Sequence, residues 1–322
     1  MDEHEESKLI YSIGGNIIWF KQTCISGKKN YFMIIAFLSY TVNYVVILVV
    51  IFKKEKKDSF LFSKIFMSIL YIIEVFANCR AGFTEPGILP KQYIPFVPRI
   101  LKERKYVIRG HLFNINYCTT CDIYRPPRTS HCSLCDNCVQ KFDHHCMWIG
   151  TDVGIRNYKF FYLLVFSIIL NDIYQIGFCL YILLNYLINE KDEKNGKILL
   201  IIVIPMSAVV LYNILIIIFF LGKLFCIHSF ICSSNTTYYE FFKKKFQKIP
   251  GFNPFKRNFF YNCRQIIFNL ARKSIFFDKP IDKFSDEIII TNNSEKEAKE
   301  LGNKSNIIIN NINSVDKTEV KK

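Results

Sequence analysis

Six of the 12 cysteines lie within 29 residues, at the spacing of metal ligands. The run reads Cys118-x2-Cys121-x9-His131-Cys132-x2-Cys135-x2-Cys138-x4-Asp143-His144-His145-Cys146. Repeated Cys-x2-Cys spacing in a reducing compartment favours zinc over disulfides, because Zn²⁺ binds thiolate sulfur and imidazole nitrogen tetrahedrally. Seven residues are ligand candidates: Cys118, Cys121, Cys132, Cys135, Cys138, His131 and His145. They exceed the needs of one ion and fall one short of two full sites, so we expect two structural Zn²⁺.

The end of this run, Asp143-His144-His145-Cys146, resembles the DHHC family of protein S-acyltransferases, the protein palmitoyltransferases. Within the Cys-rich domain the resemblance continues in Arg125-Pro126-Pro127-Arg128, Trp148, Gly154, Asn157 and Phe160-Phe161. Outside it, family motifs are resembled by Thr84-Glu85-Pro86-Gly87, Thr236-Thr237-Tyr238-Tyr239-Glu240 with one residue too many, Asn253-Pro254-Phe255, and Asn262-Cys263-Arg264-Gln265, in which the Asn is a structural anchor. The resemblance extends from about Tyr31 to Phe268.

The resemblance implies how the ligands are shared between two zinc sites. One site takes Cys118, Cys121, His131 and Cys138, and the other takes Cys132, Cys135, His145 and the residue at position 152. The family usually has Cys at this last position, whereas this chain has Asp152. A carboxylate oxygen can complete the tetrahedron with a weaker ligand, and water is the alternative.

Cys146 is the expected nucleophile, and two neighbouring side chains can activate it. A thiol attacks a thioester only as the thiolate, which is a minor species at neutral pH for an ordinary cysteine. His144 is not needed for metal and is the candidate general base, and Asp143 would fix its tautomer. The resemblance implies two steps, in which Cys146 takes a long acyl chain from acyl-CoA and a substrate cysteine then accepts it. Two alternatives remain: Cys146 as a further zinc ligand, and Asp143 as support for a zinc-bound His145.

Cations on the same side of the membrane can meet the phosphates of acyl-CoA. We expect such contacts from Arg125 and Arg128, which flank the zinc ligands. A second basic group follows the last apolar run and is interleaved with phenylalanines: Lys243, Lys244, Lys245, Lys248, Lys256 and Arg257. Basic-aromatic segments beside a span usually lie on anionic lipid, which is the favoured interpretation here. Nucleic acid is not an expected partner, because no groove-reading motif accompanies the charge.

Four apolar runs must position this chemistry. The chain is 51% hydrophobic, 16% aromatic and +15 in net charge, a composition typical of a membrane protein. The expected spans are Tyr31 to Phe52, Ser59 to Cys79, Phe160 to Ile188 and Ile198 to Gly222. Each is long enough, at about 1.5 Å per residue, to cross a hydrocarbon core of roughly 30 Å. Two intramembrane carboxylates, Glu74 and Asp172, are functional or structural with equal weight.

The distribution of Lys and Arg orients these spans. One side carries 34 of them and the other side 7, so the termini and the Cys-rich loop are expected in the cytosol. We expect no cleavable signal peptide, because the first 30 residues contain no apolar run and Asp2, Glu3, Glu5 and Glu6 make their start acidic. The resemblance implies an endomembrane address, in the Golgi or endoplasmic reticulum. Protein substrates are expected to present membrane-proximal cysteines.

The expected fold class is an all-α polytopic membrane protein with four transmembrane helices and a cytosolic zinc-binding Cys-rich domain between spans two and three. The expected domains are 1–30, a cytosolic N-terminus; 31–79, spans one and two; 80–159, the Cys-rich zinc domain; 160–222, spans three and four; 223–283, a basic-aromatic segment; and 284–322, a disordered tail. The rival function is a membrane-anchored zinc scaffold with weakened or lost acyltransferase activity. A transporter is a distant third, because no internal repeat of spans is seen.

Overall fold

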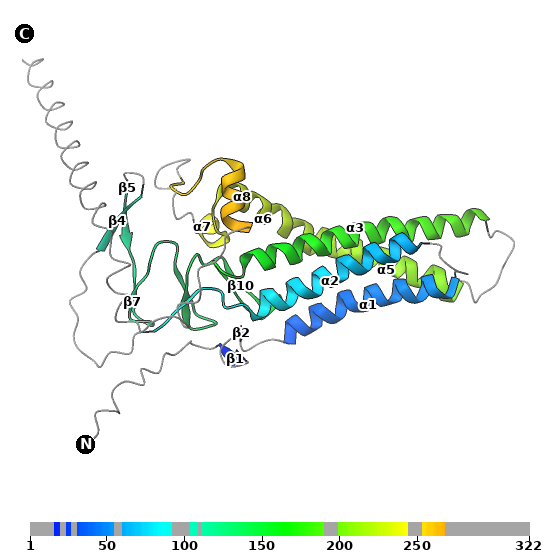
Figure 1. The fold of residues 1–322 in the computed structure, drawn as a ribbon, viewed down its shortest axis with the longest axis horizontal. Coiled ribbons are helices and arrows are strands. Elements are labelled where there is room, and N and C mark those ends of the chain that lie inside the picture. The colour runs from blue at the N-terminus through cyan, green and yellow to red at the C-terminus, as the bar shows by residue number, and fades with distance from the viewer. Residues whose placement is uncertain are drawn as a thin grey trace, which may run out of the picture.

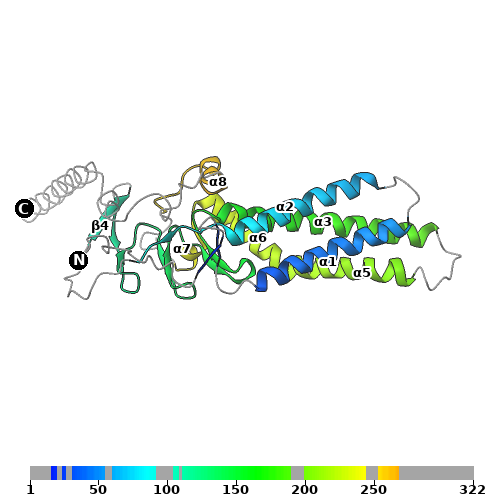
Figure 2. The ribbon, with the colours of Figure 1, turned by 60° about the horizontal axis from the view of Figure 1, so that its bottom comes forward.

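The computed structural model of the 322-residue chain describes residues 16–19, 24–26, 31–54, 60–91, 104–108, 111–189, 199–243 and 253–267. Four segments long and apolar enough to cross a membrane lie side by side, and the Cys-rich region lies at one end of them (Figures 1 and 2). The expected tail at 284–322, the two loops at the other end of the bundle, and Lys244, Lys245 and Lys248 lie outside the described residues. The chain is therefore a mostly helical, multi-pass membrane protein.

Three of the spans are single helices close to the expected ranges. They are α1 (Tyr31–Lys54), α2 (Leu61–Phe83) and α3 (Tyr158–Asn189). Many of their large apolar side chains are exposed, including Leu38, Ile72 and Leu184. Outward apolar side chains suit helices in contact with lipid, since lipid rather than a protein core covers them.

The fourth span is longer and less regular than expected. It comprises η2 (Leu199–Val203), α5 (Ile204–Ile216), η3 (Ile217–Leu221) and α6 (Gly222–Ser234). The two η segments are π-helical, and at the end of η3 the N–H of Gly222 donates to the carbonyl of Ile217. The helix does not end at Gly222, the expected end of the span, but continues through α6 to Ser234, where Asn235 adopts a left-handed φ of 47°.

The Cys-rich region is built from short antiparallel strands, which the expectation of an all-α fold did not include. The larger sheet has the order β3–β9–β8, from Ile88–Leu89, Asn137–Val139 and Ser130–Cys132. The two-stranded sheets of this region pair β4 (Arg104–Ile108) with β5 (His111–Ile115), β6 (Tyr117–Cys118) with β7 (Ile123–Tyr124), and β10 (His144–Cys146) with β11 (Thr151–Val153). A further pair, β1 (Ile17–Trp19) with β2 (Cys24–Ser26), precedes the first span. The strands are only two to five residues long, and such short pairs need additional cross-links to be stable.

Asn157 fastens the Cys-rich region to the helical bundle. Its amide donates to the carbonyls of Ala81 in α2 at 3.1 Å and of Asp152 in β11 at 2.8 Å. Its Oδ1 accepts the N–H of Gly154 at 2.9 Å. A side chain at Gly154 would meet the carbonyl oxygen of Pro86 at 2.4 Å, so only glycine fits this crossing. The family-like residues Gly154 and Asn157 thus set the position of β10 and β11 against the bundle.

The C-terminal described segment packs back onto the end of α6. Asn262, in α8 (Phe259–Ile267), donates to the carbonyls of Ser233 at 2.7 Å and Arg257 at 2.9 Å. Asn253 donates to the carbonyl of Ser234 at 2.8 Å. The structure thus gives Asn262 the hydrogen bonds of the structural anchor that the resemblance implies.

Candidate active site and metal centres

The first Cys/His cluster joins two hairpins. Cys118 and Cys121 lie around the turn between β6 and β7, and His131 stands opposite Cys138 in the β8–β9 pair. The four donor atoms lie within 4.8 Å of one another. The Nδ1 of His131 is 3.4 Å from the sulfur of Cys121 and 3.6 Å from that of Cys118. These four residues are called the first cluster below.

The second cluster has the same construction with a different fourth donor. It consists of Cys132, Cys135, His145 and Asp152, again with donor atoms within 4.8 Å. His145 and Asp152 are directly opposite each other in the β10–β11 pair. The Nδ1 of His145 is 2.8 Å from Oδ1 of Asp152 and 3.4 Å from the sulfur of Cys135. The structure therefore brings all eight expected metal-ligating residues into two groups of four.

The two clusters repeat one spacing. Each residue of the second cluster follows its counterpart in the first by 14 positions. In both, an aspartate with positive φ follows the second cysteine, Asp122 at 56° and Asp136 at 53°. This internal repeat was missed in the sequence analysis, where position 152 came only from the family resemblance. The 14-residue repeat is a sequence pattern that indicates Asp152 as the fourth member of the second cluster without any relative.

The donor sets fit zinc. Hydrogen bonds from Cys138 and Cys135 lower the pKa of the Cys121 and Cys132 thiols respectively, and the pKa of Cys138 and Cys135 is raised in turn, so one thiol of each pair favours the thiolate that zinc binds. The Oδ2 of Asp152 is buried and has no hydrogen-bond partner among the described residues. Burial raises the pKa of Asp152 to about 6. A bound cation would both satisfy this oxygen and favour the ionised carboxylate.

Asp143, His144 and Cys146 flank His145 of the second cluster in the sequence and form a Cys–His–Asp arrangement. Oδ2 of Asp143 is 2.8 Å from Nδ1 of His144, and its Oδ1 accepts the backbone N–H of Tyr238 at 2.8 Å. His144 also hydrogen-bonds to the thiol of Cys146. Because Nδ1 of His144 is taken by Asp143, the contact with Cys146 uses the other ring nitrogen. This is the order of contacts that orients a base against a nucleophile.

These contacts activate the thiol. Burial alone raises the pKa of Cys146, but the hydrogen bond and charge of His144 outweigh burial, so the pKa lies below its ordinary value. Burial lowers the pKa of His144, but the hydrogen bonds to Asp143 and Cys146 dominate and raise it to about 10. The pair therefore favours a thiolate beside an imidazolium, the reactive form of a nucleophilic cysteine.

Cys146 sits where the Cys-rich region meets the bundle. Its side chain is buried in an apolar cluster with residues of α2, α3 and α6, among them Ala77, Ala81, Phe161 and Val165. Beyond it, Trp148 is half exposed and makes an edge contact with Phe32 of α1. The thiol is thus bordered by apolar side chains from the membrane-spanning helices and by polar groups from the Cys-rich region.

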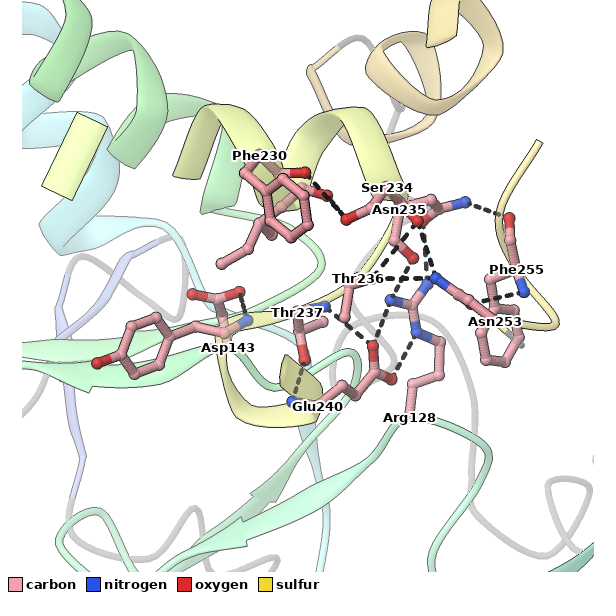
Figure 3. A network of polar contacts seen from close by, with 12 residues as sticks. Arg128, Asp143, Phe230, Ser234, Asn235, Thr236, Thr237, Glu240, Asn253 and Phe255 are labelled. Carbon is pink, nitrogen blue, oxygen red and sulfur yellow. Dashed lines mark hydrogen bonds and ion pairs between the residues drawn. The ribbon is translucent and has the colours of Figure 1, made fainter. Parts of the chain in front are cut away.

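Arg128 is committed to an internal contact. Its guanidinium forms a two-point ion pair with Glu240, at 2.8 and 2.7 Å, and donates to Asn235 (Figure 3). The ring of Phe255 lies 4.4 Å below it. The expectation of a phosphate contact is therefore not favoured for Arg128, because a bidentate, largely buried guanidinium has little capacity left for a ligand.

Glu240 explains a feature of the sequence that we interpreted as an extra residue. Thr237 and Glu240 form a capping box at the start of α7 (Tyr238–Phe242), in which each side chain accepts the other's backbone N–H. A capping box requires a spacing of three residues, as between the first Thr and the Glu of the family's Thr-Thr-x-Glu. The motif is therefore Thr237-Tyr238-Tyr239-Glu240, with Tyr238 in the second place and no insertion.

Arg125 and Arg257 differ in the contacts that their guanidinium groups make. The Arg125 guanidinium makes one long contact, 3.5 Å to the carbonyl of Tyr117, and its Nε has no partner among the described residues. Arg257 stacks on Tyr261 at 4.5 Å. Arg125 is therefore the better placed of the two expected phosphate contacts.

The two intramembrane carboxylates point into the bundle. Glu74 is buried and accepts the amide of Asn171 at 2.8 Å, and Asp172 is buried beside it. They lie on α2 and α3, away from the Asp143–Cys146 segment in the sequence, and their contacts join these two helices. This arrangement favours the structural interpretation.

One buried residue beside the Cys–His–Asp arrangement was left unassigned by the sequence. His228, in α6, is 0% exposed, and its Nδ1 is 3.0 Å from the hydroxyl of Tyr158 and 4.0 Å from Oδ2 of Asp143. The donors of Asp143, His144 and His228 lie within 4.8 Å of one another. An ionisable residue in the last turns of a span was the available clue, since such residues are rare in membrane helices without a role.

Comparisons with known proteins agree with this site. A family described as DHHC palmitoyltransferase matches residues 111–245. The chain is 30% identical over 271 residues to probable protein S-acyltransferase 6 of Arabidopsis thaliana, covering 76% of this chain and 65% of that protein. It is 35% identical over 214 residues to palmitoyltransferase ZDHHC18-A of Danio rerio, covering 61% and 45% respectively. The human palmitoyltransferase ZDHHC18 is 40% identical over 119 residues, or 32% of this chain. The chain spans less than two thirds of the length of each of these relatives.

Proposed function

We propose that this chain, whose residues 111–245 match the DHHC palmitoyltransferase family, is a protein S-acyltransferase that moves a long-chain acyl group from acyl-CoA to cysteines of other proteins. The observation that carries the proposal is the hydrogen-bonded series Asp143–His144–Cys146, with its thiol buried against the ends of the helices. A nucleophile at this boundary can meet a water-soluble CoA moiety and a membrane-embedded acyl chain at once.

In the first step Cys146 attacks the thioester of acyl-CoA. A bond forms between its sulfur and the acyl carbon, the bond from that carbon to the CoA sulfur breaks, and the proton held by His144 passes to the departing CoA thiolate. Asp143 keeps the imidazole in the tautomer whose free nitrogen faces Cys146. Acyl burial among the helices contributes about 0.8 kcal/mol per methylene, which favours long chains.

In the second step a substrate cysteine takes the acyl group from Cys146. His144 accepts the proton of the incoming thiol, the new carbon–sulfur bond forms, and the Cys146 sulfur leaves as a thiolate stabilised by the same imidazolium. The two half-reactions share one base, so ping-pong kinetics are expected. The substrates proposed are proteins with cysteines close to the membrane.

The two clusters are proposed to hold structural Zn²⁺. The first cluster would use three thiolates and one imidazole, and the second two thiolates, one imidazole and the Asp152 carboxylate. Bound zinc would supply rigidity to strands of only two to five residues, on which His144 and Cys146 are carried.

The proposed orientation places residues 80–159 and both termini in the cytosol, where acyl-CoA is found. The support is the excess of Lys and Arg on that side of the spans. Arg125 is proposed to contact a CoA phosphate. An endomembrane location, in the Golgi or endoplasmic reticulum, is proposed from the family resemblance.

The test is acyl-enzyme formation by the purified full chain in detergent, with labelled long-chain acyl-CoA. Wild type should gain a label that hydroxylamine releases, as it does a thioester, and Cys146→Ser should gain none while keeping its zinc. Cys179→Ser is the matched control and should label normally, because Cys179 is a buried cysteine of α3 and belongs to neither cluster. A folded, zinc-loaded wild type without label would contradict the proposal and favour a zinc scaffold.

A further inference from the structure

A buried polar group borders the Asp143–His144 pair on the side of the membrane helices. His228 of α6 and Tyr158 of α3 face each other, with the Tyr158 hydroxyl 3.0 Å from Nδ1 of His228 and 3.6 Å from the sulfur of Cys232. Both residues are almost completely buried. A polar pair in such a place costs free energy unless it is satisfied or has a role.

His228 lies close to both Asp143 and His144. Oδ2 of Asp143, which holds His144, is 4.0 Å from Nδ1 of His228. The ring of His144 also packs against three rings, with centroids 5.1 Å from Phe161, 5.6 Å from His228 and 5.8 Å from Tyr238. His228 itself stacks on Tyr238 at 15°. His228 is therefore part of the surface that confines the catalytic imidazole.

The hydrogen bonds indicate which nitrogen of His228 carries its proton. Nε2 is buried and has no partner among the described residues, whereas Nδ1 faces two oxygens, those of Tyr158 and Asp143. A proton on Nε2 would leave a buried donor unpaired, which folded proteins avoid. We assign the proton to Nδ1, so that the Tyr158 hydroxyl can donate to Cys232.

Resting on the proposed function, we propose that His228, held by Tyr158, is a positioning residue for acyl transfer: its Nδ1–H, 4.0 Å from Oδ2 of Asp143, favours the ionised carboxylate that holds His144. The Asp143 carboxylate accepts hydrogen bonds from His144 and from the Tyr238 backbone, and Nδ1 of His228 lies on a third side, beyond hydrogen-bond distance. Spans three and four thereby set the geometry of a base that lies in the Cys-rich region.

The variants distinguish a role of Nδ1 of His228 from a role of Nε2. The amide nitrogen of Asn can occupy the place of Nδ1, and that of Gln the place of Nε2, whereas Phe keeps the ring and removes both. His228→Asn should therefore retain most of the activity, while His228→Gln and His228→Phe should slow acyl-enzyme formation by about tenfold, because the N–H that favours the Asp143 carboxylate is lost. The half-saturating acyl-CoA concentration should not change.

Tyr158 has a matched control one turn away. Tyr162 also joins α3 to α6, because its hydroxyl is 3.1 Å from that of Ser229. Its partner is therefore Ser229 and not His228. Tyr158→Phe should slow acylation several-fold, and Tyr162→Phe should leave it unchanged. Zinc content and the elution volume in detergent check that each variant is folded.

The measurement is the single-turnover rate of Cys146 labelling by long-chain acyl-CoA, with the full chain of each variant. A labelled wild type with His228→Phe at the same rate would overturn this inference alone. Equal loss in His228→Asn and His228→Phe would also overturn it, because a nitrogen at the Nδ1 position would then give no advantage. An unlabelled wild type would overturn the proposed function, and with it this role of His228.

Discussion

The two Cys/His clusters have one architecture and different chemistry. Each uses a Cys-x2-Cys turn and a His that faces the fourth donor across a strand pair. The fourth donor is Cys138 in the first cluster and Asp152 in the second, and both are buried. A thiolate binds zinc more tightly than a carboxylate because Zn²⁺ is a borderline-soft ion. The hairpins thus fix the place of the ligand, while the residue type sets how firmly the metal is held.

The two clusters also differ in how close they lie to Cys146. In the second cluster His145 lies between His144 and Cys146 in strand β10, and Asp152 lies opposite it in β11. No member of the first cluster lies on these strands. The more weakly ligated cluster is therefore the one built into the active segment, so its metal content should affect acyl transfer directly.

The largest effect is expected from the first cluster. Cys121→Ser removes a thiolate from a site whose zinc binding is worth about 10–16 kcal/mol, which is comparable with the whole stability of a typical domain at about 5–15 kcal/mol. The variant should lose zinc and misfold, as measured by metal content per chain and by size-exclusion chromatography in detergent. Cys179→Ala, at a buried cysteine outside both clusters, should keep both metals. A monodisperse Cys121→Ser chain with two zinc ions would show that the clusters are not structural.

His144→Gln separates the base from its metal-binding neighbour. Acyl-enzyme formation should fall by about 10²–10⁴-fold, with zinc content unchanged. Because burial raises the pKa of Cys146 and the hydrogen bond and charge of His144 are the main causes that lower it, the variant should have a higher thiol pKa than wild type. Wild-type Cys146 should therefore alkylate with iodoacetamide at lower pH than the variant, as measured by peptide mass spectrometry. Identical pH profiles would remove His144 from the activation of Cys146.

Asp152→Ala tests whether the second cluster uses its carboxylate. The variant should hold one zinc ion in place of two and acylate at least about tenfold more slowly, since His145 would lose its anchor. Asp136→Asn is the matched control, because Asp136 lies beside the first cluster but is half exposed and pairs with Lys91. Metal analysis and single-turnover labelling give both readouts. Two zinc ions in a fully active Asp152→Ala chain would mean that water serves as the fourth ligand.

The smallest effect is expected from Asp152→Cys, which should give both clusters the same set of three Cys and one His. In wild type a chelator should remove one zinc ion before the other, and acylation should be lost with the first. A thiolate at position 152 should slow that first release by about tenfold without changing the second. Chelator absorbance gives the two rates. If both zinc ions leave the wild-type chain together, the proposed difference between the clusters is wrong.

Much of the site was predictable because its residues are local. All eight donor residues and the Asp143–His144–Cys146 series fall within 35 consecutive positions, and short hairpins bring such neighbours together whatever the rest of the chain does. The 14-residue repeat would even have indicated Asp152 as the fourth member of the second cluster. The four spans were predictable for a similar reason, since length and apolar composition decide membrane insertion.

Several expectations differ from the structure. The helix of the fourth span continues beyond the expected end at Gly222 to Ser234. The guanidinium of Arg128, expected at a phosphate, is paired with Glu240 of α7 and with Asn235 at the end of α6. Isolated sequence spacing cannot show which buried polar group another will meet, because many pairings satisfy the same hydrogen-bonding requirement.

The sequence by itself determined four segments apolar and long enough to cross a membrane and two sets of residues that could hold a metal around a Cys–His–Asp series, because apolar length and ligand spacing are local properties. Only the tertiary structure decided what surrounds that series. It placed the backbone of Tyr238 on Asp143, His228 against His144, and Cys146 among the ends of the helices. These contacts depend on how α3, α6 and α7 pack, and packing is a property of the whole fold.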